Sequence, residues 1–343
     1  MLILNLIAIL IKASKMNKFF NYLLHPILFI LMNSSCSHNS KIKIIFDTDA
    51  NNEIDDQHAL AYLFSNSYTF DIKGITVNAT KNGGDIKEHY EEAKRIMQLC
   101  NWYNKAPLKC GANGNFDSIK KNLQKDDFDG NKGVDFIIQE ALKYSPKEKL
   151  VVLAVGKLTN LALAVKKEPL IIPNIRLVWL GSNYPEPGEY NLDNDISSMN
   201  FLLNTIIEFE MVTVRYGNLS GTDFVKISKN EVEEKISSLG EKIETPVIGR
   251  HGGEFYSFGQ YAKSLFDNTL FHGNPPSRSL FDMAAVAIIK NPFWAKSSII
   301  PAPIMHNKKW IERPKNPRKI KIWEHFEKEL ILSDFYQALN FGE

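Results

Sequence analysis

Four aspartates lie close together near the start of the chain, in residues 43–60 (KIIFDTDANNEIDDQHAL). Asp47 and Asp49 follow an apolar run, and Asp55 and Asp56 open an amphipathic segment, which predicts a buried strand that leads through a short loop into a helix. Like charges at close range raise each other's pKa and disfavour folding. A hard cation with oxygen ligands offsets that cost, so this stretch predicts a divalent-cation site.

A fifth acidic residue has the same character far along the chain. Asp282 lies at the start of the apolar segment 279–289 (SLFDMAAVAII), which predicts a buried helix. An ionised carboxylate there needs a partner or a cation. Taken alone, Asp282 reads as a helix cap; beside the other aspartates it becomes a candidate metal ligand.

The elements that must position these residues follow an alternating pattern from residue 41 onward. The predicted strands are 42–46, 72–77, 107–110, 150–155, 175–180 and 211–214. The predicted helices are 56–64, 85–99, 134–142, 160–167 and 196–203, with further helices at 231–239, 257–266, 280–289 and 324–339. Continuous apolar strands separated by helices predict an α/β fold: an open, mostly parallel, doubly wound sheet of Rossmann-like type, with helices on both faces and extra helices near the C-terminus.

Polar residues follow the predicted strands, where parallel sheets place their sites. Asp47 and Asp49, Asn78, and the stretches 156–160 and 181–191 all come directly after a strand. Because no proline- or glycine-rich linker divides the chain, residues 41–343 are expected to form a single domain.

Charge and composition exclude one class of partner. The 343 residues are 44% apolar and carry a net charge of +2, from 41 basic and 39 acidic residues. Residues 1–35 hold Lys12, Lys15 and Lys18 and no acid, so the rest of the chain has 38 basic and 39 acidic residues, a net of −1. A near-neutral protein has no electrostatic basis for binding nucleic acid. Of the cysteines beyond residue 36, Cys100 and Cys110 are expected to be core residues, and a pair between them stays open for an exported protein.

Residues 1–36 have the features of a targeting segment. An apolar run at 22–32 follows Lys18 and precedes small residues and Cys36, which resembles a bacterial lipoprotein signal. The chain is therefore expected to be exported, to the periplasm or the cell surface, and to touch a membrane only through a lipid on Cys36. A plain cleaved signal and an N-terminal membrane anchor are the alternatives.

Five motifs in order resemble one enzyme family. They are DTD at 47–49 with Asp55-Asp56, GITVN at 74–78, GKLTN at 156–160, EYN at 189–191 and FDMA at 281–284. Together they resemble the inosine–uridine-preferring nucleoside hydrolases over roughly residues 41–290. The resemblance implies the nucleoside hydrolase fold and a Ca²⁺-dependent N-glycosyl hydrolase of purine or pyrimidine salvage. It would cleave ribonucleosides, or a related N-riboside, to ribose and free base by direct attack of a metal-bound water. A homo-oligomer is also implied.

The resemblance assigns catalytic and cation-binding roles. Asp49 is expected to bind Ca²⁺ and to take a proton from the attacking water. Asp56, the backbone carbonyl of Thr159 and Asp282 are expected to complete the protein ligands. Asn78 is expected to lie near the ribose and the water, as a catalytic residue.

Other residues are assigned to the substrate or to support. Asp55, Glu189 and Asn191 are expected to hold the ribose hydroxyls, and carboxylates beside the ring would stabilise its oxocarbenium-like transition state. Asp47 and Asn160 are expected to support the site from behind.

Three departures from the family pattern bear on the site. The loop from Asp49 to Asp56 is two residues longer than the usual D-P-G-x-D-D. Its Glu53 is expected to be exposed, with entry into the ligand shell of the cation as the alternative. Lys157 replaces a proline. Phe281 stands where family members often carry a histidine that protonates the leaving base; it is a possible stacking contact for the base instead. The side chains that stand near enough in sequence to replace that histidine are His251, Tyr256, Tyr261 and His272.

Two rival functions share some of these residues. An exported binding protein would hold a ribosyl ligand without cleaving it. The motif from Asp47 to Asp49 also resembles that of haloacid-dehalogenase-like phosphatases, with Asp47 as the nucleophile and Mg²⁺ as the cation, but Asn51 departs from that motif, and Glu189 and Asn191 would have no role.

Overall fold

The computed structural model describes residues 40–340. The chain divides into the units Met1–Ser40 and Lys41–Glu343, and the expected signal segment with Cys36 lies outside the described residues. Within residues 40–340, no helix is long and apolar enough to cross a membrane.

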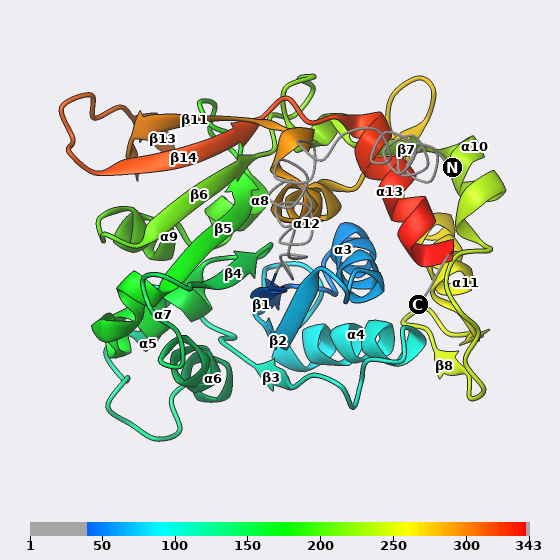
Figure 1. Ribbon diagram of the computed structural model, residues 1–343, viewed down its shortest axis with the longest axis horizontal. Coiled ribbons are helices and arrows are strands. Elements are labelled where there is room, and N and C mark those ends of the chain that lie inside the picture. The colour runs from blue at the N-terminus through cyan, green and yellow to red at the C-terminus, as the bar shows by residue number, and fades with distance from the viewer. Residues whose placement is uncertain (1–39, 341–343) are drawn as a thin grey trace, which may run out of the picture. The chain divides into compact units, whose positions relative to one another are not determined.

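An eight-stranded sheet forms the centre of the unit Lys41–Glu343 (Figure 1), with strand order β11-β14-β6-β5-β4-β1-β2-β3. The strands are β1 Ile42–Thr48, β2 Phe70–Val77, β3 Leu108–Cys110, β4 Leu150–Ala154, β5 Ile175–Ser182, β6 Glu208–Thr213, β11 Lys296–Pro301 and β14 Lys319–Glu324. Only the edge strand β11 pairs antiparallel, against β14, while the other pairings are parallel. The mostly parallel, doubly wound sheet predicted from the sequence is confirmed.

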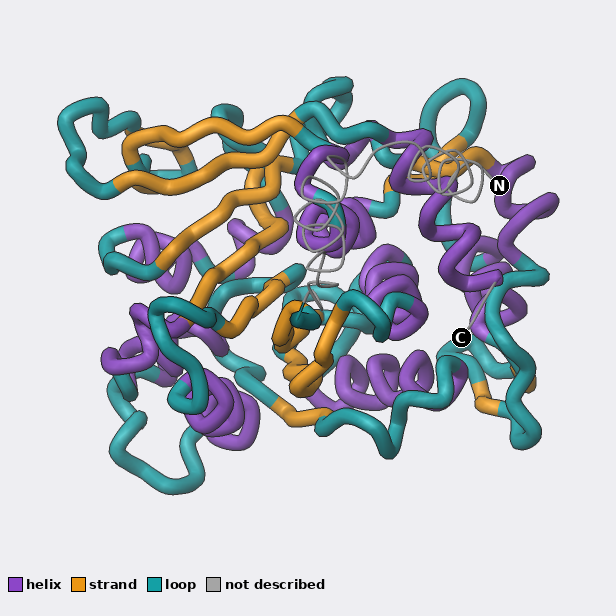
Figure 2. Tube along the Cα trace, in the orientation of Figure 1, coloured by secondary structure: helices purple, strands orange, loops and turns teal. Residues whose placement is uncertain are grey.

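Helices cover both faces of the sheet, as Figure 2 shows. Ile44 and Phe46 of β1 face one apolar core, and Ile45 between them faces the other, because successive strand side chains point to opposite faces. The first core is covered by α3 Asp55–Ser65, α4 Ile86–Leu99, α11 Phe258–Asp267, α12 Phe281–Lys290 and α13 Lys328–Asn340. The second is covered by α5 Phe116–Ile119, α6 Asn131–Ala141, α7 Thr159–Lys167 and α9 Ile196–Leu203.

The edge built by β11 and β14 was not predicted from the sequence. Lys296, Lys319 and Lys321 interrupt these strands, and β11 is largely exposed. Lysines on an outer strand discourage pairing with another chain, and they also remove the continuous apolar run by which the inner strands are recognised.

The region after residue 215 is less helical than predicted. The expected helix at 231–239 is a short α10, Lys229–Glu231, that continues as the π-helical turn η3, Val232–Ile236. Short antiparallel pairs join β7 Lys226–Ser228 to β10 Ser277–Ser279, β8 Val247–Ile248 to β9 Glu254–Phe255, and β12 Ile304–His306 to β13 Lys309–Ile311. The remaining elements are α8 Tyr190–Asn194 and the short 3-10 helices η1 Pro169–Asn174, η2 Thr222–Phe224 and η4 Pro292–Trp294.

Candidate active site

A cavity of about 470 Å³ opens at the carboxyl ends of the central strands. One part of its lining carries carboxylates and an amide, from Asp49, Asp55, Asp56, Glu189, Asn191 and Asp282. Val155, Leu180 and Val214, which lie at or near the carboxyl ends of strands β4, β5 and β6, add apolar surface. The cavity therefore lies where the parallel sheet predicts a site. Seven of the residues expected from the sequence line it, the six polar ones named above and Phe281.

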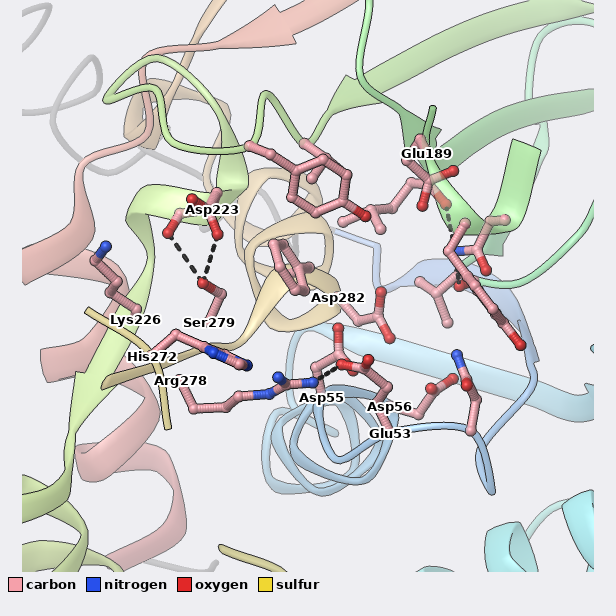
Figure 3. A pocket seen from close by; sticks show the side chains of 18 of the residues that line it. Glu53, Asp55, Asp56, Glu189, Asp223, Lys226, His272, Arg278, Ser279 and Asp282 are labelled. Carbon is pink, nitrogen blue, oxygen red and sulfur yellow. Dashed lines mark hydrogen bonds and ion pairs between the residues drawn. The ribbon is translucent and has the colours of Figure 1, made fainter. Parts of the chain in front are cut away.

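Three carboxylates form the centre of the acidic part (Figure 3). One oxygen each of Asp55, Asp56 and Asp282 lies within 4.8 Å of the other two, and all three residues are buried. Asp55 and Asp56 begin α3 and Asp282 lies in the first turn of α12. The two helices pack against each other, so both present the positive end of their dipole to these carboxylates, which favours negative charge there.

These carboxyl groups resist ionisation in the absence of a cation. Burial, followed by repulsion from Asp56, raises the pKa of Asp55 to about 8. Burial raises the pKa of Asp49 to about 7, and the Asp55 and Glu189 charges add to the effect. The pKa values of Asp56 and Asp282 also lie well above 3.8, mainly because of burial and then because of the other aspartates. A compact set of buried carboxylate oxygens whose pKa values are raised in this way fits a hard divalent cation.

The longer loop still brings its carboxylates together. Asn52 N–H donates to the Asp49 carbonyl (2.9 Å), and the Asn51 amide donates to the Gly83 carbonyl (2.7 Å). The Arg250 guanidinium donates to the backbone carbonyls of Asn51 and Glu53. The two additional residues are therefore held as an ordered bulge against a later part of the chain. Glu53, expected to be exposed, has a 41% exposed side chain that lines the cavity and is ion-paired to Arg278.

The Asp49 side chain is fixed beside this bulge. The Thr80 hydroxyl donates to its Oδ2 at 2.5 Å, and the residue is 1% exposed. A Cβ on Gly156 would come within 3.0 Å of Asp49 Oδ1 and 2.8 Å of the Asn78 amide atoms. A glycine at 156 is therefore required for this close approach of β4's end to Asp49.

Glu189 and Asn191 form the next part of the cavity wall. Glu189 caps α8 by accepting from Leu192 N–H at 2.8 Å, and burial raises its pKa to about 7. The Asn191 amide donates to the carbonyls of Val155 (2.6 Å) and Leu180 (3.2 Å). Asn191 is thereby held at the ends of two adjacent strands.

Three of the expected residues lie behind the cavity rather than on its surface. The Asp47 carboxylate accepts hydrogen bonds from Thr76 Oγ1 (2.5 Å), Asn160 Nδ2 (2.7 Å) and Asn78 Nδ2 (3.0 Å). Asp47 and Asn160 are thus placed where supporting residues were expected. Asn78 was expected beside the ribose, but it is fully buried, does not line the cavity, and leaves its Oδ1 without a partner among the described residues.

Thr159 lies apart from the cavity in which its backbone carbonyl was expected to bind the cation. Thr159 begins α7, is fully buried, and donates its hydroxyl to Asp195 Oδ2 at 2.5 Å. It does not line the cavity. Strand β4 ends at Ala154, so the residue that emerges at the cavity is Val155, four positions earlier. Sequence reasoning missed Val155 because a residue that offers only its backbone carbonyl can be of any type.

Lys157, which replaces a proline, has a structural role that was also missed. Its ammonium is buried and donates to the carbonyls of Asn113 (3.0 Å) and Gly114 (2.6 Å). It anchors the loop after β3 to the turn between β4 and α7. The side chain lies outside the main cavity.

A different set of side chains lines the far part of the cavity. Phe281 and Tyr216 meet edge to face with their ring centroids 5.9 Å apart, and Lys226, His272 and Arg278 lie beyond them. Of the four residues considered as replacements for the absent histidine, His272 alone lines the cavity. Tyr261 is buried against the Glu92 carboxylate at 2.7 Å.

The fold and this acidic cavity define an α/β protein with a carboxylate-lined site for a polar ligand, and sequence comparison identifies the family. Residues 44–324 match the family described as inosine-uridine preferring nucleoside hydrolase. The chain therefore belongs to that family and is an N-glycosyl hydrolase of the nucleoside hydrolase type. No match was found among curated protein sequences.

Solved structures share the fold across nearly their whole length. The plant nucleoside hydrolase PpNRh1 aligns with a TM-score of 0.66 and 16% identity over 88% of this chain and 99% of its own. The purine-preferring ribonucleoside hydrolase from Gardnerella vaginalis aligns with a TM-score of 0.62 and 18% identity over 87% and 98%. The inosine-uridine preferring nucleoside hydrolase from Bacillus anthracis aligns with a TM-score of 0.60 and 15% identity over 87% and 99%.

Proposed function

We propose that this protein hydrolyses the N-glycosidic bond of ribonucleosides, or of a related N-riboside, to ribose and free base with the aid of Ca²⁺. The observation that carries the proposal is the buried cluster of Asp55, Asp56 and Asp282 beside Asp49 and Glu189. Burial, and then repulsion between the carboxylates, raises the pKa values of Asp55 and Asp282. A bound cation would offset that repulsion and keep the carboxylates ionised.

Asp49, Asp56 and Asp282 would hold the cation, and the Val155 carbonyl takes the place that was expected for Thr159. Oxygen-only ligands suit Ca²⁺. When bound, the cation supplies positive charge that keeps the carboxylates ionised and makes a nearby water more acidic. Asp55 then remains for the substrate, in company with Glu189 and Asn191.

The chain's own residues carry the remaining chemistry. Asp55, Glu189 and Asn191 bind the ribose hydroxyls and orient the ring, and the carboxylates stabilise the positive charge that develops on it. Asp49, ionised and held by Thr80, removes a proton from the attacking water. The water oxygen bonds to the anomeric carbon as the bond to the base breaks, without a covalent enzyme intermediate.

A panel of nucleosides tests this proposal. The purified protein should release reducing sugar and free base in the presence of Ca²⁺, and a chelator or Asp49→Ala should abolish that release. Tight binding of a nucleoside without turnover, unaffected by Asp49→Ala, would favour the ribosyl-binding protein instead. The phosphatase alternative loses support because the proposed nucleophile Asp47 is occupied by three hydrogen bonds and does not line the cavity.

We further propose export to the periplasm or cell surface, with a lipid on Cys36, and a homo-oligomeric assembly. The sequence of residues 1–36 supports the first proposal, and the family resemblance supports the second. Cys36→Ala should release the protein from the membrane fraction, while an unchanged membrane fraction would count against the lipid. Light scattering on the purified protein measures the assembly.

A further inference from the structure

The cavity has a second, basic wall opposite the carboxylates. Lys226 comes from β7 and Arg278 from its partner strand β10, and His272 lies in the segment before β10 (Figure 3). Among the described residues, Lys226 has no ion-pair or hydrogen-bond partner for its ammonium. If the ribose lies against the carboxylates, the bond to be cleaved points from that side of the cavity toward the basic wall. The leaving group then lies against Phe281, Tyr216 and the basic wall.

Arg278 is the most constrained of these basic residues. Its side chain is 13% exposed and extends from β10 toward the carboxylates, where the guanidinium forms an ion pair with Glu53 (Figure 3). Its Nε is buried and has no hydrogen-bond partner among the described residues. Burial of this charge lowers the pKa of the guanidinium. A ligand in the cavity cannot reach this buried Nε. The nitrogens that can donate to a ligand are the Nη groups, of which Nη2 is bonded to Glu53 among the described residues.

The departing base is a ligand that such a donor would stabilise. Cleavage leaves the electron pair of the broken bond on a ring nitrogen, which must be stabilised by a proton or by positive charge. Phe281 has no proton to give. Asp223 has its carboxylate occupied by Ser279 Oγ (2.7 Å) and Gly217 N–H (2.8 Å). Lys226 and His272 also line this part of the cavity, but Arg278 is the one of these three basic side chains that an ion pair holds in place among the described residues.

We propose that Arg278 contacts the leaving group and stabilises the negative charge that develops on it, while Glu53 positions the guanidinium. This inference rests on the proposed nucleoside hydrolysis. The water proton goes to Asp49, the water oxygen to the anomeric carbon, and the electron pair to the base. Arg278 donates hydrogen bonds and keeps its own proton, and the released base takes a proton from solvent. A base that presents acceptor atoms toward Arg278 is the preferred substrate.

Glu53 gives the longer loop a function in this scheme. The two additional residues form the bulge that Arg250 holds through backbone carbonyls. That bulge places the Glu53 carboxylate on Arg278 across the cavity. A loop of the usual length would lack this ion pair. The two additional residues of the loop therefore account for the position of Arg278 beside the leaving group.

Two substrates with different leaving groups test the inference. We would compare kcat/KM for a nucleoside such as uridine or inosine with that for 4-nitrophenyl β-D-ribofuranoside, whose leaving anion is stable without help. Arg278→Met should lower kcat/KM for the nucleoside by about 10²- to 10³-fold and for the nitrophenyl riboside by less than about threefold, because only the nucleoside needs the guanidinium. Arg278→Lys should recover part of the nucleoside activity.

Matched variants separate this role from a structural one. Glu53→Gln should reduce nucleoside turnover selectively and by less than Arg278→Met. Arg250→Met loosens the same loop without removing a cavity side chain, and should affect both substrates equally. Equal losses with Arg278→Met for both substrates, or no loss for the nucleoside, would overturn the inference. Failure of the unaltered protein to release ribose from any substrate would overturn the proposed function itself, so the two failures are distinguishable.

Discussion

Replacement of Asp282 by asparagine should stabilise the metal-free protein and remove its response to calcium. Asp282 lies buried with Asp55 and Asp56, their oxygens within 4.8 Å of one another. Asparagine keeps the size of the side chain and removes its charge. The substitution therefore relieves repulsion in the metal-free state and deletes a ligand in the bound state.

The magnitude follows from the separation of the charges. Two unit charges about 4.8 Å apart repel by roughly 3 kcal/mol at an effective dielectric constant near 20. Because the raised pKa values keep some of these groups protonated, we expect a net gain of about 1–3 kcal/mol, or about 2–6 °C in Tm for a domain of this size.

The pH dependence of this gain has a definite sign. The folded-state pKa of Asp282 is raised well above 3.8 and that of Asp55 to about 8. Groups with raised folded-state pKa values contribute stability that is present at low pH and is lost as pH rises through those values. The Asp282→Asn gain should therefore be larger near about pH 8.5 than near about pH 5.

Thermal unfolding with and without Ca²⁺ measures both effects. In the unaltered protein, Ca²⁺ at about 100 times its Kd should add about 2.7 kcal/mol of stability, and Asp282→Asn should lose most of that increase. A calcium-induced Tm shift equal to that of the unaltered protein would refute the assignment of Asp282 as a ligand. A loss of stability at both pH values would refute the electrostatic reasoning.

Three further substitutions test other parts of the site. Asp49→Asn should lower kcat by about 10²- to 10⁴-fold, the usual contribution of a general base, with the fold retained by circular dichroism; a kcat near the original value would exclude Asp49 as the base. Glu189→Gln keeps an acceptor for Leu192 N–H and should lower kcat/KM by about tenfold or more with little change in Tm, since it removes a charge that stabilises the transition state; a matching loss of Tm would indicate a structural role. Lys157→Met should cost about 1–3 kcal/mol of stability because it leaves the Asn113 and Gly114 carbonyls without their buried donor. We expect a lower denaturant midpoint and an unchanged kcat. A lower kcat at unchanged stability would contradict this structural role.

The sequence was informative where side-chain type and order carry the signal. Continuous apolar runs identified the inner strands, and the ordered motifs identified Asp49, Asp55, Asp56, Glu189, Asn191 and Asp282, all of which line the cavity. Their assembly follows from parallel topology, which brings strand ends to one edge. The packing of α3 against α12 then adds Asp282 from a distant segment.

Other features leave little trace in residue type. Val155 faces the cavity because strand β4 ends just before it, whereas Thr159 already lies in helix α7. Asn78 follows a strand like the others, but its amide turns toward Asp47. The ion pair between Glu53 and Arg278 joins residues far apart in sequence, so no local pattern could predict it.

Calcium titration of chelator-treated protein, followed by ribose release from a nucleoside, tests the central claim most directly. If the buried carboxylates form a cation site for riboside hydrolysis, activity should be absent after chelation and return in a saturable manner with Ca²⁺, while Asp56→Asn should need far more Ca²⁺ or stay inactive. Full ribose release in chelator, or the same calcium dependence in Asp56→Asn, would contradict it.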